Sequence, residues 1–295
     1  MSDVLTSRRQ CLEFYSKEVA KGNSWTDLCP YAIAETLSTA SCQLPDATDP
    51  YTGDFLSTVN AIEVDGNLVR VCRGGAHRLL AHANLDEYEI SPTLPAVHLL
   101  ETALHMITDD PCKAVVGSFL SVLVPISHRS GTSYFSSASF YSPPHCGFFT
   151  EWADQFIAPS VVFPTPCWEA ASDNLYHEAL HQQLIISLRC NRLILCHRPG
   201  FETDFFVDVP WRNVRWHGEQ AFHGFFVYSR LAQYRYCLAN RTNVESVRAT
   251  LLGAAQIAQN CATTLREALV KHPDFFSRNG LLELENYRGA LPEFS

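Results

Sequence analysis

The sequence has no cluster of lysine and arginine residues, and its 295 residues carry a formal net charge of -9. Proteins that follow nucleic-acid phosphates need clustered positive charge, which argues against a general nucleic-acid binder. No stretch reaches the roughly 18 consecutive apolar residues that span a bilayer, and the apolar run at 115–126 is too short. We therefore expect neither a nucleic-acid partner nor a membrane association.

The first ten residues are polar and lack the apolar core of a secretory signal. The eleven cysteines are odd in number, and no two of them form a CxxC pair. Zinc-ribbon and thioredoxin-type proteins therefore have no support. We expect a cytoplasmic protein whose thiols are mostly buried and pack as small hydrophobic side chains.

Internal repeats, low-complexity segments and a clear linker are also lacking, and 46% hydrophobic and 18% charged residues are ordinary for a globular protein. The residue pattern changes near residue 110. It predicts a mainly helical N-terminal region, 1–110, and a second region, 111–295, expected to form one compact unit. In the first region we expect helices at 7–20, 30–38 and 95–107, and a hairpin at 60–72 that turns at Asp65-Gly66.

In the second region, three stretches rich in apolar or alternating residues predict strands at 115–126, 133–141 and 156–163, with a turn at 143–147. Helices are expected at 168–188, 219–238 and 244–269, with a loop at 201–215. The small residues Gly253, Ala254 and Ala255 suit close helix packing. The predicted fold is α+β and predominantly helical, with a small, mostly antiparallel sheet packed on a helical layer.

The chain contains one compact chemical motif, His177-Glu178-Ala179-Leu180-His181, within the predicted helix 168–188. Residues four apart lie one turn apart on the same helix face, so His177 and His181 can bind one divalent metal ion. Glu178 projects from the adjacent face. The helical layer is therefore expected to carry a metal site. The alternative is a core helix with two hydrogen-bonded histidines and a surface glutamate.

A catalytic metal site needs a third protein ligand. His223 is the leading candidate, because its neighbours are aromatic and a buried imidazole needs a partner. An ordinary core histidine bonded to a backbone carbonyl is the alternative. For the two cysteines that lie close to the motif in the sequence, a packing role is favoured over a role as thiolate ligand. The other candidates by position are Glu202, Glu219, His217 and His197 for the third ligand, and Cys190 and Cys196 for the thiolate.

Three motifs in order resemble the HExxH-motif peptide-modifying proteins of ribosomal natural-product clusters, regarded as iron(II)- and 2-oxoglutarate-dependent peptide β-hydroxylases. They are His177-Glu178-x-x-His181-Gln182-x-Leu184, Pro210-Trp211-Arg212, and His223-Gly224 before an aromatic-rich helix. The resemblance covers about a third of the chain, roughly residues 135–235. One departure is that three histidines replace the usual two histidines and one carboxylate.

The resemblance implies that His177, His181 and His223 are the iron ligands. It implies that Arg212 binds the C5 carboxylate of 2-oxoglutarate. Arg215 is a second candidate for that role or for binding the substrate, and Arg198 is a weaker third. A guanidinium binds a carboxylate through two parallel hydrogen bonds. Solvated loop charges are the alternative for the arginines. Glu178 is expected to act either as an outer hydrogen-bond partner of the site or as a general base.

The leading hypothesis is therefore an Fe(II)/2-oxoglutarate-dependent dioxygenase that hydroxylates a C–H bond. Its substrate would be a peptide or an amino-acid-derived natural-product intermediate. This substrate would arrive either free or attached to a leader peptide or a carrier protein. The alternative is a zinc-dependent metallopeptidase with Glu178 as general base. A second alternative is a non-enzymatic helical binding protein with a structural metal or none.

Overall fold

The computed structural model describes residues 10–11, 13, 59–72, 80–81, 83–91, 93–107, 111–131, 133–140, 145–189 and 205–287. They divide into two compact units, each described by itself. One unit, called the sheet unit below, holds the described residues up to 157 and those of 165–183. The other, the helical unit, holds 158–164 and the described residues from 184 onward. The predicted boundary near residue 110 stays a prediction, because much of 1–110 lies outside the described residues, including the predicted helix 30–38 and most of 7–20.

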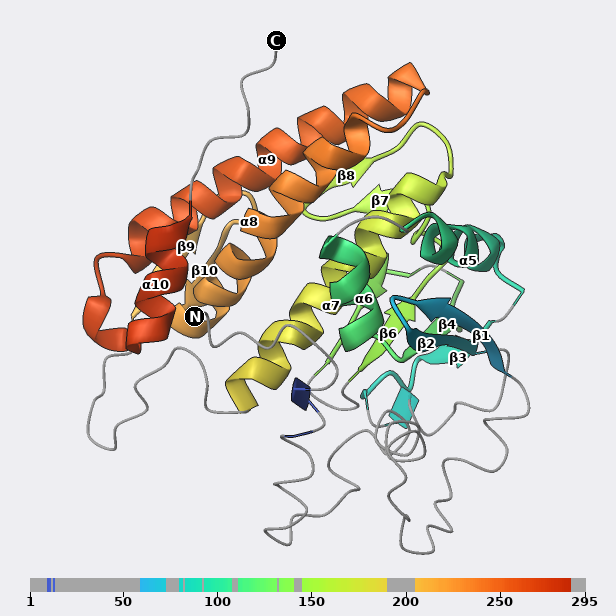
Figure 1. The fold of residues 1–295 in the computed structure, drawn as a ribbon, viewed down its shortest axis with the longest axis horizontal. Coiled ribbons are helices and arrows are strands. Elements are labelled where there is room, and N and C mark those ends of the chain that lie inside the picture. Colours follow the sequence, from blue (N-terminus) through green and yellow to red (C-terminus); the bar gives the residue numbers. More distant parts are fainter. Residues whose placement is uncertain are drawn as a thin grey trace, which may run out of the picture. The chain divides into compact units, whose positions relative to one another are not determined.

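The described residues confirm the α+β fold class with mostly helical content (Figure 1). The main sheet has the order β1-β2-β4-β6-β5, and β3 also pairs with β4. The β1–β2, β3–β4 and β5–β6 pairs are antiparallel, whereas β4 is parallel to both β2 and β6. These strands are β1 (Val59–Val64), β2 (Asn67–Cys72), β3 (Tyr88–Ile90), β4 (Val122–His128), β5 (Ser137–Ala138) and β6 (Cys146–Phe149).

The hairpin predicted at 60–72 is confirmed as β1 and β2. Val64 pairs with Asn67, and the two residues between them have positive φ angles, 51° at Asp65 and 70° at Gly66. Two positive φ angles define the tight turn whose twist matches a two-stranded ribbon. The local sequence therefore determines this element.

The centre of the sheet is the apolar strand β4. Its alternate residues Val122, Val124 and Ile126 are fully buried and share one cluster with Phe148 of β6. Burial of such a side chain contributes about 1.5–3 kcal/mol. Helices α5 (Pro95–Met106) and α6 (Pro111–Phe119) pack near β1, and α5 confirms the helix predicted at 95–107.

The predicted strand 115–126 is wrong in its first half, which belongs to α6. Hydrophobic periodicity does not distinguish a short buried helix from a buried strand. The strands predicted at 133–141 and 156–163 are much shorter, reduced to β5 and to β7 (Phe156–Ile157) and β8 (Val161–Val162). The turn predicted at 143–147 is described only from His145, and Cys146 already begins β6.

The long helix α7 (Trp168–Arg189) confirms the helix predicted at 168–188. In the helical unit, α8 (Gly218–Ala239) and α9 (Glu245–Leu269) confirm the helices predicted at 219–238 and 244–269. The two helices pack side by side (Figure 1). A 3-10 turn at Pro273–Phe275 and helix α10 (Arg278–Asn286) come after them. Among the described residues, no helix combines the length and the apolar character needed to cross a membrane.

The loop predicted at 201–215 is wrong from residue 206 onward. There the chain forms a hairpin of β9 (Phe206–Val209) and β10 (Val214–His217), with Val207 and Val209 buried and Phe206 and Asp208 exposed. The close packing predicted for Gly253 is also wrong, because a Cβ atom there would meet nothing within 4 Å. The close approach occurs instead at Gly224, where a Cβ would lie 2.6 Å from the Trp216 ring.

Candidate functional site

The two histidines of the motif meet on one face of α7. Their Nε2 atoms lie 2.8 Å apart, and their ring centroids are separated by 4.6 Å. Metal–nitrogen bonds of about 2.0–2.1 Å at a right angle place two ligand nitrogens roughly 3 Å apart. The ring nitrogens of His177 and His181 therefore have the separation of two neighbouring ligands of one ion.

His177 and His181 can supply two ligands of a metal ion, and to that extent the residues present fit a metal site. Within the described ranges, no group of three or more His, Cys, Asp or Glu side chains gathers closely enough to hold a metal ion. The third ligand predicted from sequence, His223, lies on α8 of the helical unit, whereas His177 and His181 belong to the sheet unit. The full ligand set thus remains a prediction.

Glu178 is buried beside the pair, with 2% of its surface exposed. Its Oε1 is 2.7 Å from the Ser137 hydroxyl on β5. Its Oε2 is also buried and has no hydrogen-bond partner among the described residues. Burial raises the pKa of Glu178 to about 7, although the hydroxyls of Ser137 and Ser139 act in the opposite direction. A carboxyl group with this pKa exchanges its proton near neutral pH.

The Ser137 hydroxyl donates toward two acceptors, one of which is Oε1 of Glu178. The Ser137 hydroxyl also lies 2.9 Å from Oδ1 of Asn174. That oxygen is an acceptor, because the Asn174 amide group donates to the carbonyl oxygens of Ala153 and Phe156. A hydroxyl has a single hydrogen. Ser137 shares it between Oε1 of Glu178 and Oδ1 of Asn174, and the Ser136 hydroxyl also donates to Oδ1 of Asn174, at 3.0 Å.

Sequence reasoning missed a stripe of buried polar residues along α7. Asn174, Glu178 and Gln182 are four residues apart and therefore share one helix face. Gln182 accepts a hydrogen bond from the backbone N–H of His145 and donates one to the carbonyl of Phe140. The stripe anchors α7 to residues 136–140 and to His145, and His177 and His181 lie on the adjacent face. The four-residue spacing was visible in the sequence, but its partners were not.

His223, on α8, has the protonation state of a metal ligand. Burial lowers its pKa to about 4, so the imidazole is neutral at pH 7. Of the competing candidates, His217 is the N-cap of α8, and its Nδ1 accepts a hydrogen bond from the Glu219 backbone N–H. Glu219 itself lies in the first turn of α8. The remaining candidates Cys190, Cys196, His197, Arg198 and Glu202 lie outside the described residues.

The two arginines predicted to bind a co-substrate have different surroundings. Arg215 on β10 faces its cross-strand neighbour Asp208, with 3.5 Å between Nε and the carboxylate, and both side chains are exposed. Arg212 lies in the turn between β9 and β10 and hydrogen bonds to the Tyr228 hydroxyl of α8. Arg215 therefore has a carboxylate partner, and Arg212 is the better candidate for binding an external carboxylate.

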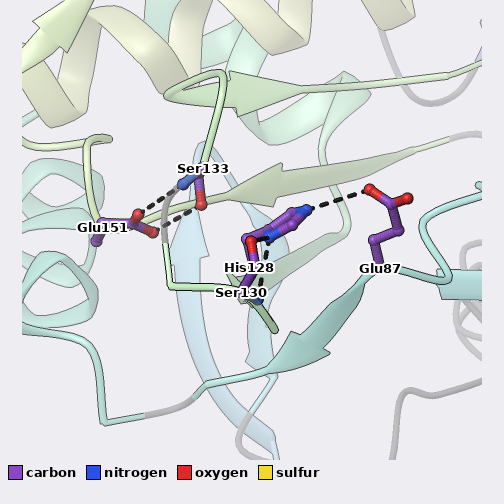
Figure 2. A network of polar contacts seen from close by, with 5 residues as sticks. All are labelled: Glu87, His128, Ser130, Ser133 and Glu151. Atoms are coloured by element: carbon purple, nitrogen blue, oxygen red, sulfur yellow. Dashed lines mark hydrogen bonds and ion pairs between the residues drawn. The ribbon is translucent and has the colours of Figure 1, made fainter.

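A second polar network in the sheet unit was also missed from the sequence (Figure 2). Nδ1 of His128 lies 2.6 Å from the Ser130 hydroxyl and accepts from the Ser130 backbone N–H, so Nε2 carries the hydrogen and faces Glu87 at 3.2 Å. Glu151 accepts two hydrogen bonds from Ser133. The Glu87 side chain is 80% exposed. We therefore infer that these contacts stabilise the turn that follows β4.

Neither a scan against protein-family models nor a search of curated proteins returns a match. The resemblance to the HExxH-motif proteins therefore stays a prediction, and support for a function comes from the geometry of the described residues.

Proposed function

We propose that this protein is an Fe(II)/2-oxoglutarate-dependent oxygenase that hydroxylates a C–H bond of a peptide or amino-acid-derived natural-product intermediate. The observation that carries the proposal is the histidine pair of α7, whose Nε2 atoms lie 2.8 Å apart. Iron(II) takes imidazole and oxygen donors, and three protein ligands leave positions for a bidentate 2-oxo acid and dioxygen. When bound, the metal would let dioxygen act as the oxidant for hydroxylation, and the 2-oxo acid would be the co-reductant that leaves as succinate and carbon dioxide.

In this proposal each residue has a separate task. His177, His181 and His223 hold the metal, all as neutral imidazoles. Arg212 binds the distal carboxylate of the 2-oxo acid, because a guanidinium offers two parallel donors to it. Glu178 is not a ligand. It bonds to Ser137 at 2.7 Å, and through that contact it fixes the rotation of α7 and hence the direction of the two imidazoles.

The location and partners of the protein belong to the same proposal. Buried thiols, such as Cys72, Cys146 and Cys261, support a reducing, cytoplasmic environment. We propose that the substrate arrives free or on a leader peptide or carrier protein. Neither nucleic acid nor a membrane has a role in this scheme.

A zinc-dependent metallopeptidase is the second candidate, and one observation favours it. The pKa of Glu178, raised by burial to about 7, suits a general base that takes a proton from water near neutral pH. In this alternative Glu178 is the catalytic residue, and His177 and His181 hold zinc.

The two candidates are separated by turnover assays on metal-free protein reloaded with one metal. With Fe(II), 2-oxoglutarate and air, the oxygenase proposal expects slow succinate release even without substrate. His181→Ala should lower that rate at least tenfold. His105 is an exposed histidine on α5, so His105→Ala should leave the rate unchanged. Glu178→Gln should retain part of the rate.

Hydrolysis of an unstructured peptide by the zinc-loaded protein, lost in Glu178→Gln, would instead establish the peptidase. Absence of both activities, with a fold shown by circular dichroism to be intact, would contradict both candidates.

A further inference from the structure

Several hydrogen-bond donors and positive charges converge on one place in the helical unit. Trp211 and Arg212 belong to the turn between β9 and β10, Tyr228 and Arg235 to α8, and Cys261 to α9. The three elements pack against one another within this unit. The cluster is therefore formed by side chains whose relative positions are fixed by one packed core.

Trp211 has a donor with no acceptor. Its ring contacts Tyr228 edge to face at a centroid distance of 6.1 Å, and Trp216 at 6.2 Å. Its Nε1 atom is buried, and no described residue accepts a hydrogen bond from it. An indole N–H can only donate, and a buried donor left without an acceptor costs free energy. An acceptor from outside the chain would remove that cost.

Positive charge surrounds the same place. Arg235 is fully buried and donates to the carbonyl oxygens of Ala254 at 3.2 Å and Ala158 at 2.6 Å. Burial raises the pKa of Cys261 to about 11, while the charges of Arg235 and Arg212 oppose that rise. Burial likewise raises the pKa of Tyr228, again opposed by both arginines. The charges of both guanidinium groups therefore reach Tyr228 of α8 and Cys261 of α9.

No carboxylate within the described ranges pairs with Arg212. The other arginines of these elements differ, since Arg215 faces Asp208 and Arg230 binds Glu283 at 2.9 Å. Arg212 is exposed, whereas Tyr228 and Arg235 are buried. An anion can thus approach Arg212 from solvent, next to Trp211, its neighbour in the turn, and to Tyr228, its hydrogen-bond partner.

We infer that Trp211, Tyr228 and Arg235 form, together with Arg212, a binding site for one carboxylate group of a small organic acid. Nε1 of Trp211 and the Tyr228 hydroxyl each donate one hydrogen bond to it. The Tyr228 hydroxyl accepts from Arg212 at the same time, which its two lone pairs allow. Arg235 supplies charge from behind without direct contact. The inference rests on the proposed function, in which Arg212 binds 2-oxoglutarate, and it adds three residues to that task.

The test observes the indole N–H of Trp211 by NMR in metal-free protein. Trp211→Phe identifies its resonance by loss of one indole signal. Addition of succinate or 2-oxoglutarate should shift that resonance downfield, because a hydrogen bond to a carboxylate deshields the proton. The indole of Trp152, an exposed residue of the sheet unit, serves as the unshifted reference.

Calorimetric titration with succinate then gives the contribution of each donor. Trp211→Phe and Tyr228→Phe should each weaken binding about tenfold, the loss expected for one hydrogen bond to a charged group. Arg235→Met should also weaken binding, provided that its circular dichroism matches the wild type. The matched control is Tyr236→Phe, which removes a hydroxyl from the same helix outside the cluster.

The inference is overturned if the Trp211 resonance does not move, or if chloride and sulfate at equal ionic strength move it as far as succinate does. Carboxylate binding without succinate-forming turnover under Fe(II) would leave this site standing and contradict the oxygenase. Turnover that is unaffected by Trp211→Phe and Tyr228→Phe would contradict this site and leave the oxygenase proposal standing.

Discussion

Burial sets the protonation of two residues of the candidate site, Glu178 and His223. The pKa of Glu178 is raised and the pKa of His223 is lowered, because burial disfavours the charged form of each side chain. The sequence predicted the spacing of His177 and His181 from helix geometry. It did not predict the contact of Glu178 with Ser137, which lie 41 positions apart and come together only through the packing of α7 on β5.

Asp154, in the turn between β6 and β7, provides a test of the burial effect away from the candidate metal ligands. Burial raises the pKa of its carboxyl group, so the folded state favours the protonated form. Its contribution to stability is complete below the pKa of the unfolded chain, about 3.9, and is lost as the pH rises through the raised value. Asp154→Asn should therefore gain stability relative to wild type between pH 4 and pH 7.

Urea unfolding of both proteins across this pH range measures that difference. A stability difference that is the same at pH 4 and pH 7, or that changes in the opposite direction, would contradict the assigned shift.

The thiols should differ widely in reactivity. Burial raises the pKa of Cys167 to about 12 and that of Cys261 to about 11, from an ordinary value near 9. At pH 8 the thiolate fraction should be about a thousandfold lower for Cys167, and about a hundredfold lower for Cys261, than for a thiol of ordinary pKa. Alkylation depends on the thiolate. Iodoacetamide labelling and peptide mass spectrometry should show Cys237, which is exposed, modified first. Equal labelling of all three in the native protein would disprove this ordering.

At the scale of elements, the long helices were predictable and the short strands were not. The helices α7, α8 and α9 have 22, 22 and 25 residues, long enough for a 3.6-residue period to be recognised. The hairpin β9–β10 was mistaken for a loop because each strand has four residues and one exposed face. The second half of α6 was assigned to a strand because it begins with two adjacent β-branched residues, Val115 and Val116.

Two glycine substitutions test the packing of these elements in opposite directions. A Cβ atom at Gly117 of α6 would overlap the carbonyl oxygen of Val64 at the end of β1, whereas at Gly253 of α9 it would meet only solvent. Gly117→Ala should destabilise the fold by about 1–3 kcal/mol through overpacking. Gly253→Ala should stabilise it by about 0.5–1 kcal/mol, because alanine loses less entropy in a helix.

Denaturant titration of the two variants gives both values. Equal effects of the two substitutions would mean that α6 does not approach β1 as closely as described.

For the whole molecule, composition and periodicity predicted the α+β class, and the motif predicted two candidate ligands. The ordering of strands in the sheet was not predictable, since β4 pairs with β2 and β6 across long intervening segments and no local pattern encodes such pairing. Two of the proposed ligands, His177 and His181, belong to the sheet unit, whereas His223 and the proposed carboxylate site belong to the helical unit.

The most direct test is the visible absorption spectrum of the anaerobic protein as Fe(II) and then 2-oxoglutarate are added. Our proposal predicts a metal-to-ligand charge-transfer band that needs both additions. The band should disappear in His181→Ala and in His223→Ala and persist in His105→Ala. Absence of the band in the wild-type protein, together with tight zinc binding, would contradict the oxygenase and favour the peptidase. A band that survives His223→Ala would reject His223 as the third ligand.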